Sequence, residues 1–223
     1  MMKPIFVAGN LIFNLFFLNL IAQDSLTIKE NNHFFIVKTN LNSLVDYTPA
    51  LQFSFQYHIF DRLHLQHEAG FITHYLSPFW YSDSKLIGYR IKNQVKYYIY
   101  PYTSDLNFVY VALEAMFKKI SYEDERYFGR YDNAYFESIR FEKRKNLLAF
   151  SLMLGFEPVL ENKNWLLDIY GGLGFRHLVI TEVLPPDLTE SRWSMFRRSQ
   201  GNYNLPGLYF GIRVGYKFSQ LNF

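Results

Sequence analysis

Charged side chains recur at alternate positions within otherwise apolar stretches of this sequence. In residues 208–218, for example, Arg213 and Lys217 share their parity with Gly211 and Gly215. On one enclosed face such side chains would form either a charged path for ions or a network of paired charges, because buried charges must be paired. The residues placed in this way are Lys38, Glu68, Arg90, Lys92, Lys96, Glu114, Lys118, Glu157, Asp168, Arg176, Arg213 and Lys217.

The histidines of "LHLQHEAGFITHY" offer a weaker indication of chemistry. His64 and His67 are three residues apart, so on a strand they face opposite sides and cannot both bind one metal ion. His74 lies near Ser77, but a hydrolase needs a third group that orients the base, and none is evident. We therefore expect no metal, no cofactor and no catalytic residue, and a membrane lipid hydrolase is the most distant alternative.

Two further stretches combine aromatic residues with arginines, which is the composition of binding hot spots. Outward arginines are also suited to phosphate groups such as those of lipopolysaccharide. The alternative for the first stretch is an exposed hairpin, in which two long strands extend beyond their neighbours. The binding candidates in the two stretches are Tyr127, Phe128, Arg130, Tyr131, Arg192, Trp193, Arg197 and Arg198.

These residues must be positioned by strands, because alternation with a period of two recurs along most of the chain. No helical period of comparable length competes, so we expect no helix after the N-terminal segment. Short and long connections alternate between the strands, which predicts an up-and-down barrel. The eight expected strands are residues 34–44, 50–60, 63–75, 86–100, 108–120, 139–160, 165–180 and 208–218.

Composition narrows the class of protein. The 223 residues suffice for one domain, and the absence of cysteine excludes disulfides and thiolate sites. The formal charge of +3 is small and spread along the chain, which argues against a nucleic-acid partner. Residues 1–23 have the layout of a secretory signal peptide, with a membrane-anchoring helix as the alternative. Residues 24–223 would then form the barrel domain.

The two faces of the strands would see different solvents. A secreted lipocalin-like barrel would bury the apolar face, whereas a membrane barrel would expose it to lipid. The strands reach the length of about 9–11 residues that crosses a membrane, and the other face carries glycines with both charge signs. Aromatic residues at strand ends, among them Tyr98, Phe108 and Trp165, match the girdles of membrane barrels. We therefore expect an all-β, eight-stranded antiparallel up-and-down transmembrane β-barrel.

The chain resembles the small eight-stranded outer-membrane β-barrels of Gram-negative bacteria, of the OmpA/OmpX/OmpW type. The resemblance rests on the signal peptide, on the final strand "LYFGIRVGYKFSQLNF" and on the terminal aromatic residue. The segment "VKTNLNSLVDYTPALQFSFQYHIFDRLHLQHEAGF" is also similar to the first three strands of an uncharacterised family of such barrels. In these proteins the barrel-assembly machinery reads a terminal aromatic residue, which here is either Phe218 or Phe223.

The resemblance implies a location in the cell outer membrane, surrounded by its lipid and lipopolysaccharide. An eight-stranded barrel is just wide enough for side chains, so we expect a filled polar interior rather than a channel. The expected role is structural, or the binding of an extracellular protein or glycan through the long loops. A narrow pore for small solutes and a secreted lipocalin-like barrel remain the alternatives.

Overall fold

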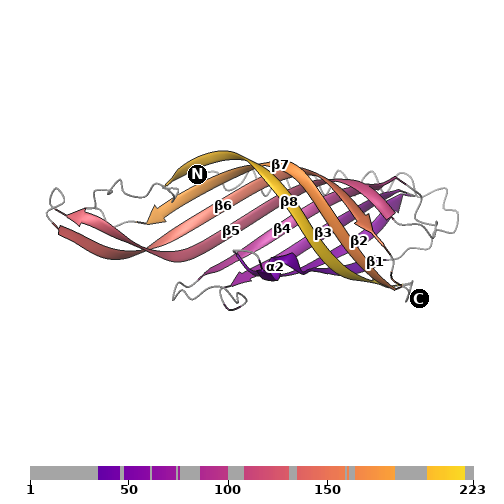
Figure 1. The fold of residues 1–223 in the computed structure, drawn as a ribbon, viewed down its shortest axis with the longest axis horizontal. Helices are drawn as coiled ribbons and strands as arrows, with labels where there is room; N and C mark the ends of the chain where they lie inside the picture. Colours follow the sequence, from indigo (N-terminus) through magenta and orange to yellow (C-terminus); the bar gives the residue numbers. More distant parts are fainter. Residues whose placement is uncertain are drawn as a thin grey trace. The chain divides into compact units, whose positions relative to one another are not determined.

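The computed structural model describes residues 35–45, 48–60, 62–73, 75, 86–99, 108–130, 135–158, 160, 164–183 and 200–218. Within these residues the strands form a closed barrel in which each strand pairs with its neighbours along the chain and β1 pairs with β8 (Figure 1). Every pairing is antiparallel. This architecture confirms the all-β antiparallel class that the alternation predicts.

The strands differ greatly in length. The first and the last of them close the sheet, since Phe35 pairs with Phe218 and Asn40 pairs with Arg213. The elements are β1 Phe35–Asn40, α2 Asn42–Val45, β2 Ala50–Phe60, β3 Leu63–Thr73, β4 Ile87–Tyr98, β5 Phe108–Arg130, β6 Tyr135–Glu157, β7 Trp165–Val183 and β8 Gly201–Phe218.

The register of the pairs fixes the width of the barrel. Starting at Val37 on β1 and moving from each residue to its partner on the next strand, one reaches Pro206 on β8. On the closing side, however, Val37 pairs with Tyr216 of β8. Closure therefore offsets the register by the ten residues between Pro206 and Tyr216. With the usual strand rise and spacing, this offset tilts the strands by about 40° and leaves an interior that side chains can fill.

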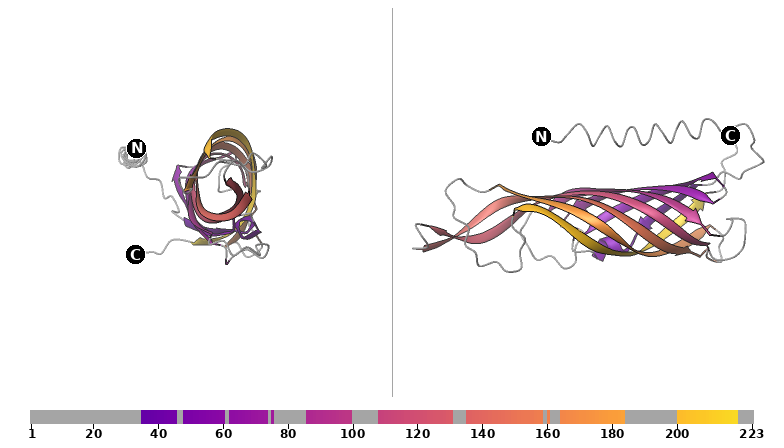
Figure 2. Two further views of the ribbon diagram at one scale, coloured as in Figure 1. Left: turned by 90° about the vertical axis from the view of Figure 1, so that its left-hand side faces the viewer. Right: turned by 90° about the horizontal axis from the view of Figure 1, so that it is seen from above.

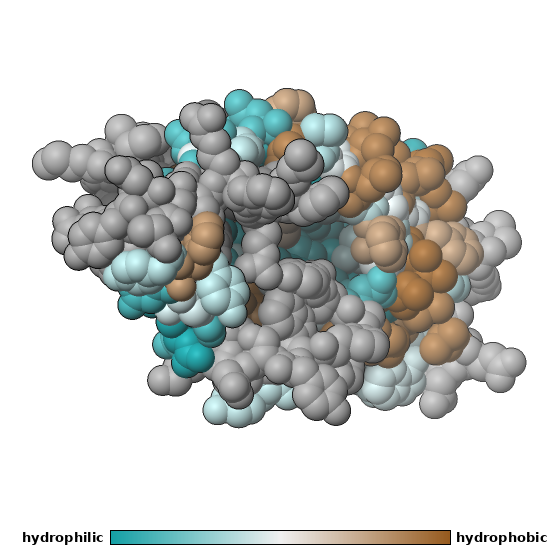
Figure 3. All heavy atoms as spheres, turned by 60° about the vertical axis from the view of Figure 1, so that its left-hand side comes forward, coloured by the Kyte–Doolittle hydropathy of each residue, from teal (hydrophilic) through white to brown (hydrophobic). Residues whose placement is uncertain are grey.

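The two faces of the sheet have opposite polarity. The inward positions carry most of the buried charged and amide side chains, including Lys38, Gln56 and Asp168, whereas large apolar side chains lie on the outside. Figure 3 shows apolar residues in brown gathered on the outer wall at the right of the view and hydrophilic residues in teal in the hollow beside them. This arrangement is the reverse of a water-soluble barrel, in which the apolar face lies inside.

The hairpin of β5 and β6 extends past the rest of the barrel. The last pair between β4 and β5 is Ile87 with Ser121, and the last pair between β6 and β7 is Glu142 with Val183. Beyond these pairs, and within the part of the chain that the structure describes, the backbone of each of the two strands pairs with no strand except the other, as far as Arg130 and Tyr135. The prediction of a loop here is wrong, and the alternative of an exposed hairpin is confirmed (Figure 2).

The last strand begins seven residues earlier than the alternation predicts, at Gly201 rather than Leu208. The segment contains Pro206, which normally indicates the end of a strand. Proline is tolerated on an edge, where its missing N–H leaves no partner unbonded. This part of β8 has such an edge, because β1 pairs with it only from Arg213 onward.

The four-residue helix α2 contradicts the prediction that no helix follows the N-terminal segment. The chain turns here under the control of side chains, because the Ser43 hydroxyl lies 2.6 Å from the carbonyl oxygens of both Asn40 and Ala50. The Asn42 amide oxygen accepts a hydrogen bond from the Ile212 N–H. No helix among the described residues is long and apolar enough to span a membrane.

Two inward glycines make room for tyrosine rings. A Cβ atom at Gly155 would overlap the ring of Tyr110, and one at Gly211 would overlap the ring of Tyr170. Glycine is the one residue without that atom, so these positions let large side chains cross the interior. They explain why glycines alternate with charged residues on the inward face.

Candidate functional site

A cluster of inward side chains fills the barrel near the end where β1 begins. Every strand contributes at least one member, and each member is at most 1% exposed. A water molecule therefore reaches almost none of their surface. We call this cluster the interior plug; its residues are Lys38 (β1), Gln56 (β2), His64 (β3), Lys96 and Tyr98 (β4), Tyr110 (β5), Glu157 (β6), Asp168 (β7) and Arg213 (β8).

The Asp168 carboxylate is the centre of the interior plug. One of its oxygens lies 3.0 Å from the Nζ atoms of both Lys38 and Lys96 and 3.2 Å from Nη1 of Arg213. The other oxygen accepts a hydrogen bond of 2.7 Å from the Tyr110 hydroxyl. Four donors from four other strands thus converge on one side chain, which satisfies a charge that no water reaches.

The Glu157 carboxylate joins the remaining strands to this centre. It pairs with the same two lysines and accepts a hydrogen bond of 2.6 Å from the Tyr98 hydroxyl. That hydroxyl in turn accepts a hydrogen bond of 2.9 Å from the Gln56 amide. His64 lies beside both, 3.3 Å from the Gln56 amide nitrogen and with its ring centroid 4.5 Å from that of Tyr98.

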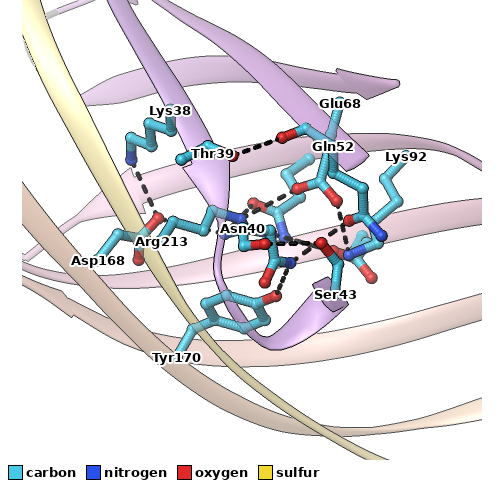
Figure 4. Close-up of polar contacts among 12 residues, drawn as sticks. Lys38, Thr39, Asn40, Ser43, Gln52, Glu68, Lys92, Asp168, Tyr170 and Arg213 are labelled. Atoms are coloured by element: carbon cyan, nitrogen blue, oxygen red, sulfur yellow. Dashed lines mark hydrogen bonds and ion pairs between the residues drawn. The ribbon is translucent and has the colours of Figure 1, made fainter. Parts of the chain in front are cut away.

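On the side of the plug away from the start of β1, the network continues from Arg213 (Figure 4). Its Nε atom lies 3.0 Å from Glu68, which also pairs with Lys92 at 2.9 Å. Its guanidinium carbon lies 3.9 Å from the ring centroid of Tyr170, whose hydroxyl accepts a hydrogen bond from Asn40. One arginine therefore connects the plug to a second layer of paired charges.

The structure brings eight of the twelve predicted charged residues together in two groups. Lys38, Lys96, Glu157, Asp168 and Arg213 meet in the plug, and Glu68, Lys92 and Glu114 lie in the layer that Arg213 reaches. The remaining four lie inward but outside these groups. Arg90 approaches the Gln52 amide and Lys118 bonds to Thr48, whereas Arg176 and Lys217 are partly exposed.

The interior residues predicted from the sequence are all charged, and the neutral members of the network are not among them. Tyr98 and Phe108 are not girdle residues: they are 0% and 6% exposed and lie inside. Alternation along the strand indicates that Tyr98 points inward, because it lies two residues from Lys96 and therefore on the same face. His64 and His67 do face opposite sides, as expected, and the described residues contain no group of three or more His, Cys, Asp or Glu that could hold a metal ion.

The binding candidates on the β5–β6 hairpin have different surroundings. Tyr127 is 70% exposed, whereas Phe128 is 2% exposed and packs edge-on against Phe141 at 5.8 Å. Arg130 ends strand β5. The other positions named from the sequence lie outside the described residues: Tyr131, Arg192, Trp193, Arg197, Arg198, His74, Ser77, Phe223 and residues 1–23, for which a signal peptide is predicted.

The base of the hairpin carries an exposed ion pair. The Arg144 guanidinium donates two hydrogen bonds to Glu142, at 2.9 and 2.8 Å, and the Ser121 hydroxyl donates a third at 2.5 Å. These bonds from Arg144 and Ser121 hold the pKa of Glu142 at about 2, below its usual value. The carboxylate thus stays charged at any ordinary pH.

No protein-family model and no curated protein sequence matches the chain. Among solved structures, the chain is similar to a major outer membrane protein from Thermus thermophilus, with 13% sequence identity and a TM-score of 0.37. The alignment covers 84% of this chain and 100% of that chain. The class of protein therefore rests on the geometry above: a closed antiparallel barrel with a charged, filled interior and an apolar outer wall.

Proposed function

We propose that this protein is an integral outer-membrane β-barrel with a filled interior, whose role is structural or surface-binding. The observation that carries the proposal is the apolar outer wall, to which every strand contributes. Leaving such side chains in water costs about 1.5–3 kcal/mol each relative to burial. The outward apolar residues at least about one-third exposed include Val37, Leu51, Phe53, Phe55, Phe71, Ile87, Ile91, Leu113, Phe150, Leu152, Leu154, Leu173, Phe175, Leu208 and Phe210.

The dimensions of the wall agree with a membrane. On β8 the outward positions from Leu208 to Phe218 are all apolar or aromatic. This run matches the 9–11 or so residues that a tilted strand needs to cross the hydrocarbon. Closure of the sheet is also what lipid demands, because an open edge would leave backbone groups without partners.

The lipocalin-like alternative would need the opposite polarity. A secreted carrier places apolar side chains around an interior ligand and polar ones in water. Here the interior holds Lys38, Lys96 and Arg213 against Glu157 and Asp168, and no apolar ligand would replace those contacts. The interior plug likewise opposes the narrow-pore alternative, because its members from all the strands are at most 1% exposed.

In outer-membrane barrels the long connections face outward from the cell. The β5–β6 hairpin would then project from the cell surface and present Tyr127, Tyr135 and Phe136, which are 50% or more exposed, to a protein or glycan partner. Lipid and lipopolysaccharide would surround the wall. Of the two candidates, we assign to Phe218 the role of the aromatic residue that the assembly machinery reads, because its ring stacks on that of Phe35 where β8 pairs with β1.

The test is refolding of residues 24–223 into lipid vesicles, followed by gel electrophoresis with and without boiling and by conductance in planar bilayers. We expect a compact band that shifts on boiling, since a closed ring of strands has no edge from which to unravel. We also expect no steady conductance. A soluble, unshifted protein would overturn the membrane assignment, and steady single-channel currents would establish the pore instead.

A further inference from the structure

Three polar side chains lie on the outer wall, in the midst of its apolar residues. Tyr57, His67 and Asn93 project outward from β2, β3 and β4 and bond to one another. The Tyr57 hydroxyl lies 3.3 Å from Nε2 of His67, and Nδ1 of His67 lies 2.6 Å from Oδ1 of Asn93. We call these three residues the outer-wall triad.

The row of paired residues that crosses the triad is otherwise apolar. Phe55 pairs with His67, His67 with Asn93, and Asn93 with Ala115. The outward neighbours one step along the strands are also apolar: Ala69 is exposed and Ile91 is 44% exposed. The triad is therefore surrounded by the surface that, on the proposed function, faces hydrocarbon.

The hydrogen-bond inventory leaves one group of the triad unsatisfied. An amide oxygen only accepts, so Nδ1 of His67 donates to Asn93 and Nε2 accepts from Tyr57. Both ring nitrogens are then used. The Asn93 amide nitrogen makes no hydrogen bond with any described residue, and its oxygen retains a second lone pair. Hydrocarbon offers neither a donor nor an acceptor to this amide.

A second copy of this chain would provide the Asn93 amide with both a hydrogen-bond donor and an acceptor. An amide is self-complementary, so two Asn93 side chains that meet on a two-fold axis can each donate to the other's oxygen. Small residues permit close approach in membrane interfaces, and polar residues bond across them. Ala69 and Ala115 flank the triad in this way on neighbouring strands. A two-fold axis normal to the membrane also keeps both barrels in one orientation.

We propose that the outer wall around β3 and β4 is a homodimer interface, with Asn93 at the two-fold axis; this inference rests on the proposed membrane function. Ala115 lies one strand from Asn93, which displaces it by about 4.8 Å to the side of the axis, and packed sheets lie about 10 Å apart. The backbones of the two copies of Ala115 would therefore be about 14 Å apart. That separation suits a short cross-linker.

The chain contains no cysteine, so single cysteines can be introduced without a background. We would refold Ala115→Cys into dilute lipid vesicles and treat it with a short bismaleimide. The matched control is Leu173→Cys, because Leu173 is also outward and 67% exposed but lies on β7. We expect cross-linked dimers of the first variant and only background with the second.

The decisive variant adds Asn93→Leu to Ala115→Cys. Leucine suits hydrocarbon, so this chain should still insert and shift on boiling, while its cross-linking falls to the Leu173→Cys level. Equal cross-linking with and without Asn93, or background cross-linking of Ala115→Cys in correctly inserted barrels, would overturn the dimer and leave the membrane function standing. Failure of every variant to insert would instead contradict the proposed function.

Discussion

Replacing Asp168 by asparagine tests whether the interior plug stabilises the barrel. The substitution keeps the shape of the side chain but removes the charge on which Lys38, Lys96 and Arg213 converge. Breaking a buried ion pair by removing one partner costs about 3–5 kcal/mol, because a buried charge is left uncompensated. The prediction concerns the free energy of unfolding in detergent or lipid.

The geometry selects the lower end of that range. Both lysines keep Glu157 as a partner, and Arg213 keeps Glu68 at 3.0 Å. No cation of the plug is therefore left without any carboxylate, and we expect the Asp168→Asn variant to lose about 3 kcal/mol. The hydrogen bond from Tyr110 has a weaker acceptor in the amide, which adds to the loss rather than opposing it.

The assay is urea unfolding followed by tryptophan fluorescence, with the loss of the compact gel band as a second probe. The midpoint should fall without a change of slope, because the surface exposed on unfolding is the same. Adding Lys96→Met should restore part of the loss, since it removes one of the cations that lost a partner. The control is Glu125→Gln, which breaks an exposed pair with Arg140 and should leave the midpoint unchanged.

Two results would refute this reasoning. An Asp168→Asn variant that unfolds at the same urea concentration as the native protein would mean that the paired charges do not stabilise the barrel. A double variant less stable than Asp168→Asn alone would mean that Lys96 acts through its packing and not through its charge.

Other parts of the barrel support three more predictions. Gly155→Val should lower the free energy of unfolding by about 1–3 kcal/mol, because the added side chain would overpack against the ring of Tyr110. The control is Gly171→Ala, whose added Cβ would face outward and lie 3.7 Å from its nearest neighbouring atom. This variant should unfold like the native protein. Arg144→Leu should raise the pKa of Glu142 from about 2 toward its usual value, which NMR titration would measure. Because the low pKa belongs to the folded state, the stability that this pair contributes is present at neutral pH and is lost as the pH falls toward 2. Replacing residues 124–141 by a short turn should leave the heat-dependent gel shift intact, because among the described residues the backbone of this segment pairs only within itself. A barrel that no longer refolds would contradict this.

The position of each inward residue could be predicted from the sequence because it follows from local parity. Successive side chains on a strand point to opposite sides, so Lys38, Asp168 and Arg213 are assigned to one face without knowledge of any partner. The same parity places Tyr98 inside, although its aromatic character at a strand end also suggested a girdle. Alternation likewise predicted the apolar outer wall.

The length of β5, β6 and β8 could not be predicted, because it depends on neighbours. The residues from Tyr122 to Arg130 are polar enough for a loop, yet they remain extended because β6 supplies a partner for each of them. Pro206 is compatible with a strand only because β1 is too short to reach it. Whether a proline breaks a strand is decided by the adjacent strand and not by the proline itself.

Alternation along each strand fixes which side chains face inward, whereas the closure of the ring fixes which of them meet. Lys38 lies 119 residues from Glu157 and 130 residues from Asp168, and their contact depends on the stagger with which β1 closes against β8. A change of that stagger would pair the same charges differently while leaving every residue on its face. Parity is a property of one strand, whereas the plug is a property of the closed ring.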